Sequence, residues 1–250
     1  MKISLIPFLN TLPFVYGLKK KPIDNKTELL YNVPSVAAEK LLNNKVDIGI
    51  VPVAVIPLLK EYYIYSDYCI GAVGKAKTVE LYSNVPLNKI EKIFLDCKSK
   101  TSINLVRILA QKYWRINPEW LNAEENYIDN IENNIAGVVI GDKNFELKDK
   151  FEYVFDLADE WRKFTSLPFV FACWIANKKL HGDFIDKFNA AIKYGVENKK
   201  AVISEWYANN DNPYNINLRE YLFENLSYEF DDLKKKGMMK FLEYLKEIKK

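Results

Sequence analysis

Asn10 and Thr11 are a polar pair near the start of the chain that can bind and polarise a small ligand. They follow an apolar run, Ile3–Ile6, which is typical of a buried strand, and they precede Pro13, which suits the first turn of a helix. The pair is therefore predicted where a first strand passes into a first helix. In open α/β sheets, ligands bind outside this carboxyl edge of the strands. The alternative is that Asn10 and Thr11 only cap the helix, because both residue types are common caps.

A second group of hydroxyls belongs to Ser99, Thr101 and Ser102. The residues that follow, from Ile103 to Tyr113, carry apolar side chains with a helical period. A helix start offers free backbone N–H groups and a favourable dipole, so it can hold a carboxylate or a phosphate. Capping is again the alternative. Three hydroxyls so close together exceed what one cap requires, and they indicate an anion site.

Other residues are predicted at the same edge of the strands. Asp142 follows Ile135–Ile140, the most strand-like run in the chain, and it either faces a ligand or caps the next turn. Ser35 opens a second helix, and Pro52 closes the apolar strand Val46–Val51. A ligand at this edge is expected to touch Ser35 and Pro52 from one part of the chain, and Asp142 from another.

Histidine and cysteine usage excludes several kinds of chemistry. His181 is the only histidine, so neither a histidine-built zinc site nor a Ser-His-Asp triad is expected. The three cysteines, Cys69, Cys97 and Cys173, match no metal-ligand spacing and are expected to be reduced thiols. The sequence therefore predicts no metal site.

Charge and hydropathy favour a small-molecule partner. The formal net charge is +3 and the charges are interspersed, so no basic stripe for nucleic acid stands out. No apolar run reaches the ~18 residues of a membrane helix, and the N-terminus does not resemble a signal peptide. We expect a soluble, cytoplasmic protein with no nucleic-acid or membrane partner. The sequence does not determine its oligomeric state.

Strand-like and helix-like segments alternate through the first part of the chain, which predicts parallel strands joined by right-handed crossovers. A helix is expected over Val53–Leu59, and the alternation starts again from Lys77. We predict an α/β fold with mostly parallel sheets, two lobes and a hinge cleft, with crossings near Thr78 and Trp174. The predicted lobes are lobe I, residues 1–76 with 175–250, and an inserted lobe II, residues 77–174.

Five groups of segments, in this order, resemble the chorismate dehydratases that begin the futalosine route to menaquinone. Each group alone is weakly specific, but the ordered set covers the chain up to about residue 176. That family has a type II periplasmic-binding-protein-like fold, in agreement with two lobes and a cleft. The groups are Ile6–Pro13; Pro34-Ser35 with Val46–Pro52; Leu95-Asp96 with Ser99 and Thr101-Ser102; Val139–Asp142; and Trp161 with Leu167–Ala172 and Trp174.

The resemblance implies that chorismate, a dicarboxylate, loses water to give 3-[(1-carboxyvinyl)oxy]benzoate without a cofactor. It places catalytic roles on Asn10 and Thr78. The family usually has a Ser-Val pair where this chain has Thr78-Val79, so the Thr78 hydroxyl is expected to replace that of the serine, with Ser83 as the weaker substitute. The predicted substrate-binding residues are Ser35, Pro52, Thr101, Ser102, Ile103 and Asp142.

The group that removes the proton is left open among three candidates. None of the matched residues is a good base at neutral pH, so the base is Asp142, a bound water or the enolpyruvyl carboxylate of the substrate. We favour the substrate carboxylate, because a charged Asp142 would repel a dianion and positioning alone accelerates such reactions.

Two other classes of protein stay open. One is the sibling naphthoate synthase of the same pathway, whose cleft histidine has no counterpart within the predicted lobe II, because His181 follows the second crossing. The other is a non-enzymatic binding protein for small anions, which would need a signal peptide or a lipid-attachment cysteine near its start.

Overall fold

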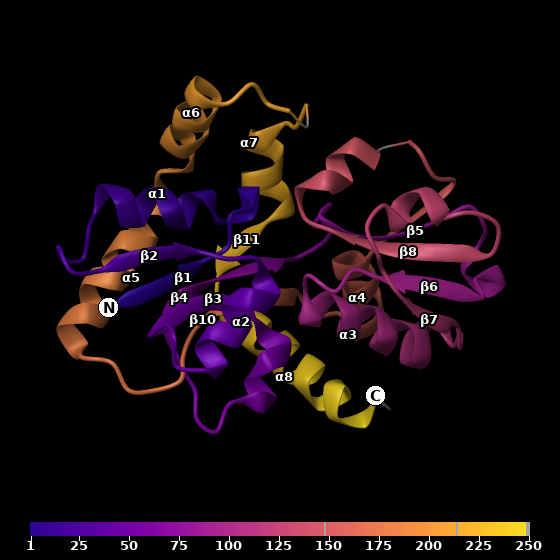
Figure 1. The fold of residues 1–250 in the computed structure, drawn as a ribbon, viewed down its shortest axis with the longest axis horizontal. Helices are drawn as coiled ribbons and strands as arrows, with labels where there is room; N and C mark the ends of the chain where they lie inside the picture. The colour runs from indigo at the N-terminus through magenta and orange to yellow at the C-terminus, as the bar shows by residue number, and fades with distance from the viewer. Residues whose placement is uncertain (148, 214, 249–250) are drawn as a thin grey trace.

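The computed structural model describes residues 1–147, 149–213 and 215–248. Two sheets lie side by side in it (Figure 1). Within the described residues the six-stranded sheet has the order β11-β4-β10-β3-β1-β2, and the five-stranded sheet the order β7-β6-β8-β5-β9. Their strands are β1 (Lys2–Leu5), β2 (Glu28–Tyr31), β3 (Ile48–Pro52), β4 (Tyr63–Ala72), β10 (Phe169–Ala176) and β11 (Ser227–Glu229), and β5 (Val79–Ser83), β6 (Lys92–Leu95), β7 (Glu119–Asn122), β8 (Ile135–Ile140) and β9 (Tyr153–Asp156).

Both sheets are mixed, so the prediction of mostly parallel sheets is wrong. β1 runs parallel to β2 and β3, and β6 runs parallel to β7 and β8. β10 is antiparallel to β3 and β4, β11 is antiparallel to β4, and β5 is antiparallel to β8 and β9. A strand buried on both faces is an apolar run whichever way its neighbours point, so the sequence pattern does not carry the direction of pairing. The predicted α/β class with two sheets is confirmed.

Helices cover both faces of the six-stranded sheet. Gly17 and Gly195 bring α1 and α5 together, since a Cβ on Gly17 would lie 2.0 Å from the Ala191 carbonyl oxygen. This packing fixes α1, and with it the turn that carries Asn10. The helices are α1 (Leu12–Lys20), α2 (Pro34–Leu42), α3 (Lys100–Ile108), α4 (Leu157–Thr165), α5 (Gly182–Glu197), α6 (Lys199–Asn209), α7 (Leu218–Glu220) and α8 (Asp232–Glu247).

The segment predicted as a helix over Val53–Leu59 is a 3₁₀ helix, η2 (Val53–Leu58). Pro57 lies inside it and has no backbone N–H to donate, so a regular α-helical hydrogen-bond ladder cannot form there. Short 3₁₀ segments commonly serve as such connectors. The connection from β3 to β4 is therefore tighter than predicted.

The chain crosses between the sheets twice, and the second crossing lies earlier than predicted. It leaves the six-stranded sheet after Ala72 and enters the five-stranded sheet at Val79, near the expected position at Thr78. It returns between Thr165 and Phe169. The predicted boundary at Trp174 is wrong because it divides β10, which pairs with β3 and β4. The remainder of the division into lobes stays a prediction.

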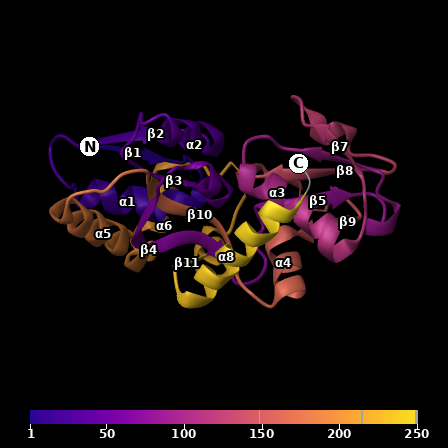
Figure 2. The same cartoon turned by 90° about the horizontal axis from the view of Figure 1, so that it is seen from below.

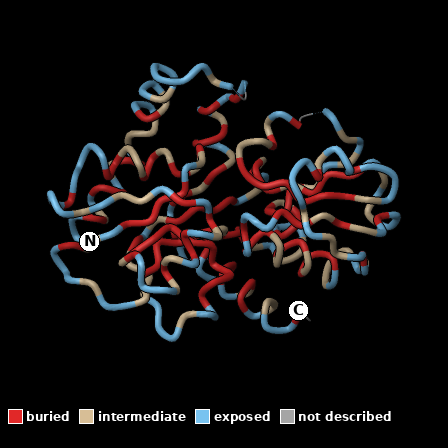
Figure 3. The backbone as a smooth tube through the Cα atoms, viewed as in Figure 1, coloured by how far each residue is buried: buried red, intermediate tan, exposed pale blue. Residues whose placement is uncertain are grey.

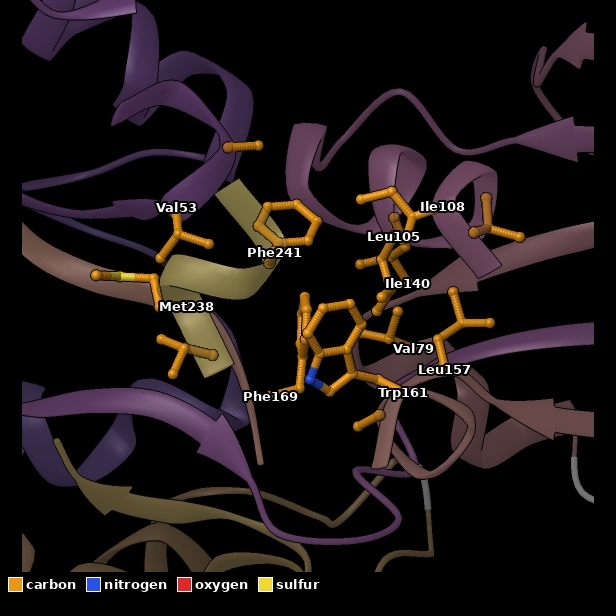
Figure 4. Packing of buried hydrophobic residues seen from close by; sticks show 14 of the residues in the cluster. Val53, Val79, Leu105, Ile108, Ile140, Leu157, Trp161, Phe169, Met238 and Phe241 are labelled. Atoms are coloured by element: carbon orange, nitrogen blue, oxygen red, sulfur yellow. The ribbon is translucent and has the colours of Figure 1, made fainter. Parts of the chain in front are cut away.

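One cluster of buried apolar side chains continues from one sheet to the other. Figure 4 shows Trp161, Phe169 and Phe241 packed together at this junction. The rings of Phe169 and Phe241 are 5.3 Å apart, and those of Trp161 and Phe169 are 5.5 Å apart. Phe241 belongs to α8, which lies across both sheets when the molecule is seen from below (Figure 2). Figure 3 shows that burial is concentrated in the sheets and at their junction.

Two further features of the fold concern membrane-spanning helices and disulfide bonds. Over residues 1–147, 149–213 and 215–248, no helix combines the length and apolar character that a membrane span needs. The thiols of Cys69, Cys97 and Cys173 are free.

Candidate functional site

A small cavity lies between the two sheets, at the carboxyl ends of β1 and β3. Its free volume is about 50 Å³, whereas sites for small molecules usually measure about 300–1,000 Å³. The two sheets therefore stand in a closed arrangement around it. Residues from both sides of the first crossing line the cavity, among them Phe8, Asn10, Pro52, Thr78, Ser102 and Gly141.

Asn10 contributes an uncommitted amide to this cavity. It lies in the 3₁₀ turn η1 (Leu9–Thr11), and its Oδ1 atom is buried without a partner among the described residues. Neither Asn10 nor Thr11 caps α1 with its side chain; the Thr11 hydroxyl donates instead to the Phe8 carbonyl at 2.9 Å. The alternative that the pair only caps the helix is therefore wrong. Tyr228 donates to the backbone carbonyl of Asn10 at 2.9 Å and fixes the turn.

Thr78 is buried at the first crossing and bonded through both its side chain and its backbone. Its hydroxyl lies 3.1 Å from the Tyr221 hydroxyl and 3.4 Å from the Ala76 carbonyl oxygen. Its backbone carbonyl accepts hydrogen bonds from the Gly141 N–H at 2.9 Å and from the Asn144 amide at 3.3 Å. These bonds hold the crossing strand against the turn that follows β8.

The start of α3 supplies hydroxyls in two directions. Ser99 is the N-cap, accepting from the Ser102 N–H at 3.4 Å, and the Ser102 hydroxyl lies 3.2 Å from the Ser99 hydroxyl. Both serines line the cavity. Thr101 points elsewhere, because its hydroxyl accepts from the Ala54 N–H at 3.2 Å. Ser99 therefore caps the helix, and ligand binding by the Ser99 and Ser102 hydroxyls at the cavity stays a prediction.

Asp142 lies beside the cavity, directly after Gly141 and at the start of a 3₁₀ turn. Its Oδ2 atom accepts from the Leu9 N–H at 3.1 Å, while its Oδ1 atom is buried with no partner among the described residues. Burial raises the pKa of the Asp142 carboxyl to about 6. Gly141 before it has a φ of +89°, and a Cβ there would lie 3.3 Å from the Phe8 ring. This residue must be glycine for the two sides of the cavity to approach so closely.

Comparison with known proteins identifies the family. The sequence matches, over residues 1–247, the model of a family described as menaquinone biosynthesis. The chain belongs to this family. It is also 29% identical, over 196 residues, to a chorismate dehydratase of Campylobacter jejuni subsp. jejuni serotype O:23/36 (strain 81-176), covering 75% of this chain and 74% of that protein. The resemblance predicted from the sequence is confirmed.

Solved structures similar to this member of the menaquinone biosynthesis family show its fold. A crystal structure of a protein from Archaeoglobus fulgidus aligns with a TM-score of 0.76 at 13% identity, over 98% of this chain and 96% of that chain. A Candida albicans protein, described as exhibiting the generic periplasmic binding protein structural fold, aligns with a TM-score of 0.65 at 14% identity, over 100% and 91%. The predicted periplasmic-binding-protein-like fold is confirmed.

Five residues predicted for the site meet at the cavity or beside it, and three do not. Asn10, Thr78, Ser102 and Pro52 line the cavity, and Asp142 follows Gly141 at its wall. The three that lie elsewhere differ in their surroundings, so their contact with a substrate stays a prediction.

Ser35, Thr101 and Ile103 are those three residues. Ser35 is half-buried at the start of α2 and lines open grooves outside the cavity. Thr101 is fully buried and bonded to Ala54. Ile103 packs against the junction cluster. Neighbouring positions on a helix point in different directions, so one turn cannot present Thr101, Ser102 and Ile103 to the same ligand.

No sequence motif predicted the contribution of the C-terminal part of this family member to the site. Tyr221 and Tyr228 are fully buried and bonded to Thr78 and Asn10, yet neither stands in a recognisable motif. Leu226 also lines the cavity. Long-range contacts of this kind depend on the fold, because more than two hundred residues separate Asn10 from Tyr228.

A second cavity of about 390 Å³ lies on the other side of Tyr221. Lys77, Glu80 and Phe145 line it, and Lys77 forms an ion pair with Glu220. It is larger, but it contains neither Asn10, Thr78 nor Ser102. The smaller cavity, where the residues matched to the family meet, is therefore the candidate functional site.

Proposed function

We propose that this chain is a chorismate dehydratase, a hydro-lyase that converts chorismate to 3-[(1-carboxyvinyl)oxy]benzoate and water. The observation that carries the proposal is the meeting of Asn10, Thr78 and Ser102 at one buried cavity between the two sheets. The family membership and the named relative from Campylobacter jejuni support it.

The reaction requires groups that hold two carboxylates and assist the departure of a hydroxyl. The C3–H bond and the C4–O bond of chorismate break, the hydroxyl leaves as water, and the ring becomes aromatic. Ser99 and Ser102, at the positive end of the α3 dipole, are placed to receive one carboxylate. The Asn10 amide and the Thr78 hydroxyl are placed to donate to the departing hydroxyl, whose developing charge such donors stabilise.

The enolpyruvyl carboxylate of the substrate is proposed to take the C3 proton and to pass it to the departing C4 hydroxyl, which leaves as water. Of the residues that line the cavity, none carries a basic side chain. Asp142 is the remaining candidate, and its pKa is raised by burial to about 6. A neighbouring dianion raises the pKa of a carboxyl further, which favours the protonated form. In that form Asp142 donates a hydrogen bond to the substrate and is not the base.

Substrate entry requires the two sheets to move apart. The cavity of about 50 Å³ cannot admit a molecule with a six-membered ring and two carboxylates. The wall formed by Phe8 and Gly141 joins the two sides and has to separate first. Closure afterwards excludes water from the reacting carbons.

We also place this activity in the futalosine route to menaquinone and in the cytoplasm. The family assignment supports menaquinone biosynthesis as the process. The free state of all three cysteines supports a reducing compartment.

The decisive experiment is incubation of the purified protein with chorismate, followed by mass-resolved chromatography. We expect chorismate to be consumed and one product, lighter by one water molecule, to accumulate with a benzoate absorption spectrum. Addition of EDTA serves as a control and is expected to leave the rate unchanged. Binding of chorismate without turnover would instead assign the chain to the non-enzymatic binding proteins.

The sibling naphthoate synthase is not favoured by any observation on the site. His181 precedes α5, is exposed and does not line the cavity. The structure thus gives no histidine to the cleft.

A further inference from the structure

The C-terminal segment that contains α7 and β11 touches both residues to which the proposed dehydration assigns a reactive role. Figure 1 shows α7 and β11 beside the boundary between the two sheets. α7 continues through one wide turn, Tyr221–Asn225, and the chain then enters β11 at the edge of the six-stranded sheet. Each end of this path supplies one buried tyrosine.

The Tyr221 hydroxyl contacts the side-chain hydroxyl of Thr78. The two hydroxyl oxygens are 3.1 Å apart, and Tyr221 is 1% exposed. The other contact of the Thr78 hydroxyl, with the Ala76 carbonyl, is longer at 3.4 Å. Phe145 packs edge-on against the Tyr221 ring at 5.2 Å. Burial raises the pKa of the Tyr221 hydroxyl well above its usual value, so it remains a neutral donor.

Tyr228 contacts the backbone of Asn10 through its hydroxyl. Its hydroxyl donates to the Asn10 carbonyl oxygen at 2.9 Å, and its ring packs edge-on against Phe14 at 5.4 Å. The pairing of β11 with β4 shifts register between Ser227 and Glu229, on either side of Tyr228. Such irregularities turn a side chain out of the plane expected from the ladder. The tyrosine is thereby aimed at the turn that presents Asn10.

We propose that Tyr221 and Tyr228 are positioning residues of the active site, which hold the Thr78 hydroxyl and the Asn10 amide in the geometry that the reaction requires. The proposal rests on the proposed function. In this arrangement Tyr221 donates to the oxygen of Thr78, and the Thr78 proton turns from the Ala76 carbonyl oxygen, 3.4 Å away, toward the hydroxyl that departs. Donation to a hydroxyl oxygen also strengthens that hydroxyl as a donor in a buried network. Neither tyrosine gains or loses a proton.

A purely structural role makes a different prediction. If the tyrosines only filled space, removal of one hydroxyl would lower stability and leave the chemical step intact. If they position the reactive groups, removal lowers kcat more than it changes KM, because the lost interaction acts in the transition state. Tyr127 provides the matched control, since it is buried and donates to the Val138 carbonyl at 2.7 Å without contacting Asn10 or Thr78.

The test compares Tyr221→Phe, Tyr228→Phe and Tyr127→Phe with the wild type in steady-state turnover of chorismate, below the melting temperature of every variant. We expect kcat to fall at least about tenfold in the first two variants with KM changed less than about threefold, and to stay within about twofold in the third. In a Thr78→Val background, Tyr221→Phe should cause no further loss of kcat, because its only route of action is gone.

The outcomes separate this inference from the function itself. No turnover by the wild type would overturn the proposed function. Turnover by the wild type with kcat unchanged in Tyr221→Phe and Tyr228→Phe, or with equal losses of kcat in all three variants, would overturn the positioning roles. Should Tyr221→Phe fail to fold, Tyr228→Phe tests the inference alone, and an unchanged kcat in that variant would contradict it.

Discussion

At the scale of single residues, Thr78 separates the chemical role of a hydroxyl from its packing role. Thr78→Ser keeps the hydroxyl and should retain activity within about threefold, whereas Thr78→Val should lose at least about tenfold, or 1.4 kcal/mol, in kcat/KM. Thr78→Val also leaves the Tyr221 hydroxyl without its partner, so its free energy of unfolding should fall by about 1–3 kcal/mol. Steady-state kinetics and urea unfolding measure the two effects separately. Full activity in Thr78→Val would turn attention to Ser83, although that hydroxyl is bonded to the Val85 carbonyl.

Asn10 gives the sharpest distinction between an enzyme and a binding protein. Asn10→Asp removes the side-chain N–H₂ and places a negative charge beside a dianionic substrate. Because the side chain makes no cap bond, the melting temperature should stay close to that of the wild type. Turnover of chorismate should fall by at least about a hundredfold, as when an oxyanion donor is removed. A variant that melts normally and keeps its activity would remove Asn10 from the site.

The raised pKa of Asp142 predicts a pH dependence of stability. Burial raises the pKa of the folded carboxyl to about 6, from an ordinary value of 3.8. The folded state therefore holds the proton more tightly than the unfolded state, so this stabilising contribution is present at low pH and is lost as pH rises through about 6. Asp142→Asn removes the titration and should gain stability relative to the wild type between pH 4 and 7, by up to about 3 kcal/mol. Melting curves at several pH values check this; a constant difference between the two proteins would contradict it.

The residues that could be predicted from the sequence are those that follow a strand or begin a helix. Asn10, Thr78 and Ser102 stand at such ends, and the edge of a sheet brings such ends together. Tyr221 and Tyr228 could not be predicted, because their positions depend on the long-range packing of the last strand and not on any local pattern.

At the scale of elements, the start of α3 is the predicted carboxylate site. Ser102→Ala removes a hydroxyl that lines the cavity and should raise KM for chorismate by about five- to tenfold, because a charge-assisted hydrogen bond is lost. Thr101→Val is the matched control: it breaks the bond to Ala54 and should lower stability without a comparable rise in KM. Kinetics and thermal melting of the two single variants decide between them. Unchanged KM in Ser102→Ala would place the carboxylate elsewhere.

At this scale, strands and helices could be predicted where the local sequence pattern is strong. The predictions were wrong where long-range contacts determine how strands pair. The apolar runs at β1, β3 and β8 are strands as expected, and α3 begins at the predicted hydroxyls. The mixed pairing of the sheets could not be predicted, because the composition of a buried strand does not show whether its neighbours run parallel or antiparallel to it. The second crossing, before Phe169, could not be predicted for the same reason. β10 is apolar along its length, and such a strand suits the core of either sheet.

At the scale of the whole molecule, α8 should contribute to stability through the junction between the sheets. Phe241 of α8 is fully buried against Phe169. Phe241→Ala should lower the free energy of unfolding by about 3–5 kcal/mol, the usual cost of deleting a buried aromatic ring. Phe241→Leu retains most of the volume and should cost less than about 1.5 kcal/mol. Urea unfolding compares the two, and equal small losses would show that α8 packs only loosely.

The position of β10 has a consequence for synthesis on the ribosome. β3 and β4 follow one another along the chain, yet β10 pairs with both and separates them in the sheet. β10 is made roughly a hundred residues after β4, which corresponds to about 5–20 s of translation. During that interval two strand edges of the nascent chain await their partner, and open edges readily pair with other chains. A cell that makes this protein has to keep those edges apart from other nascent chains until Phe169–Ala176 emerges.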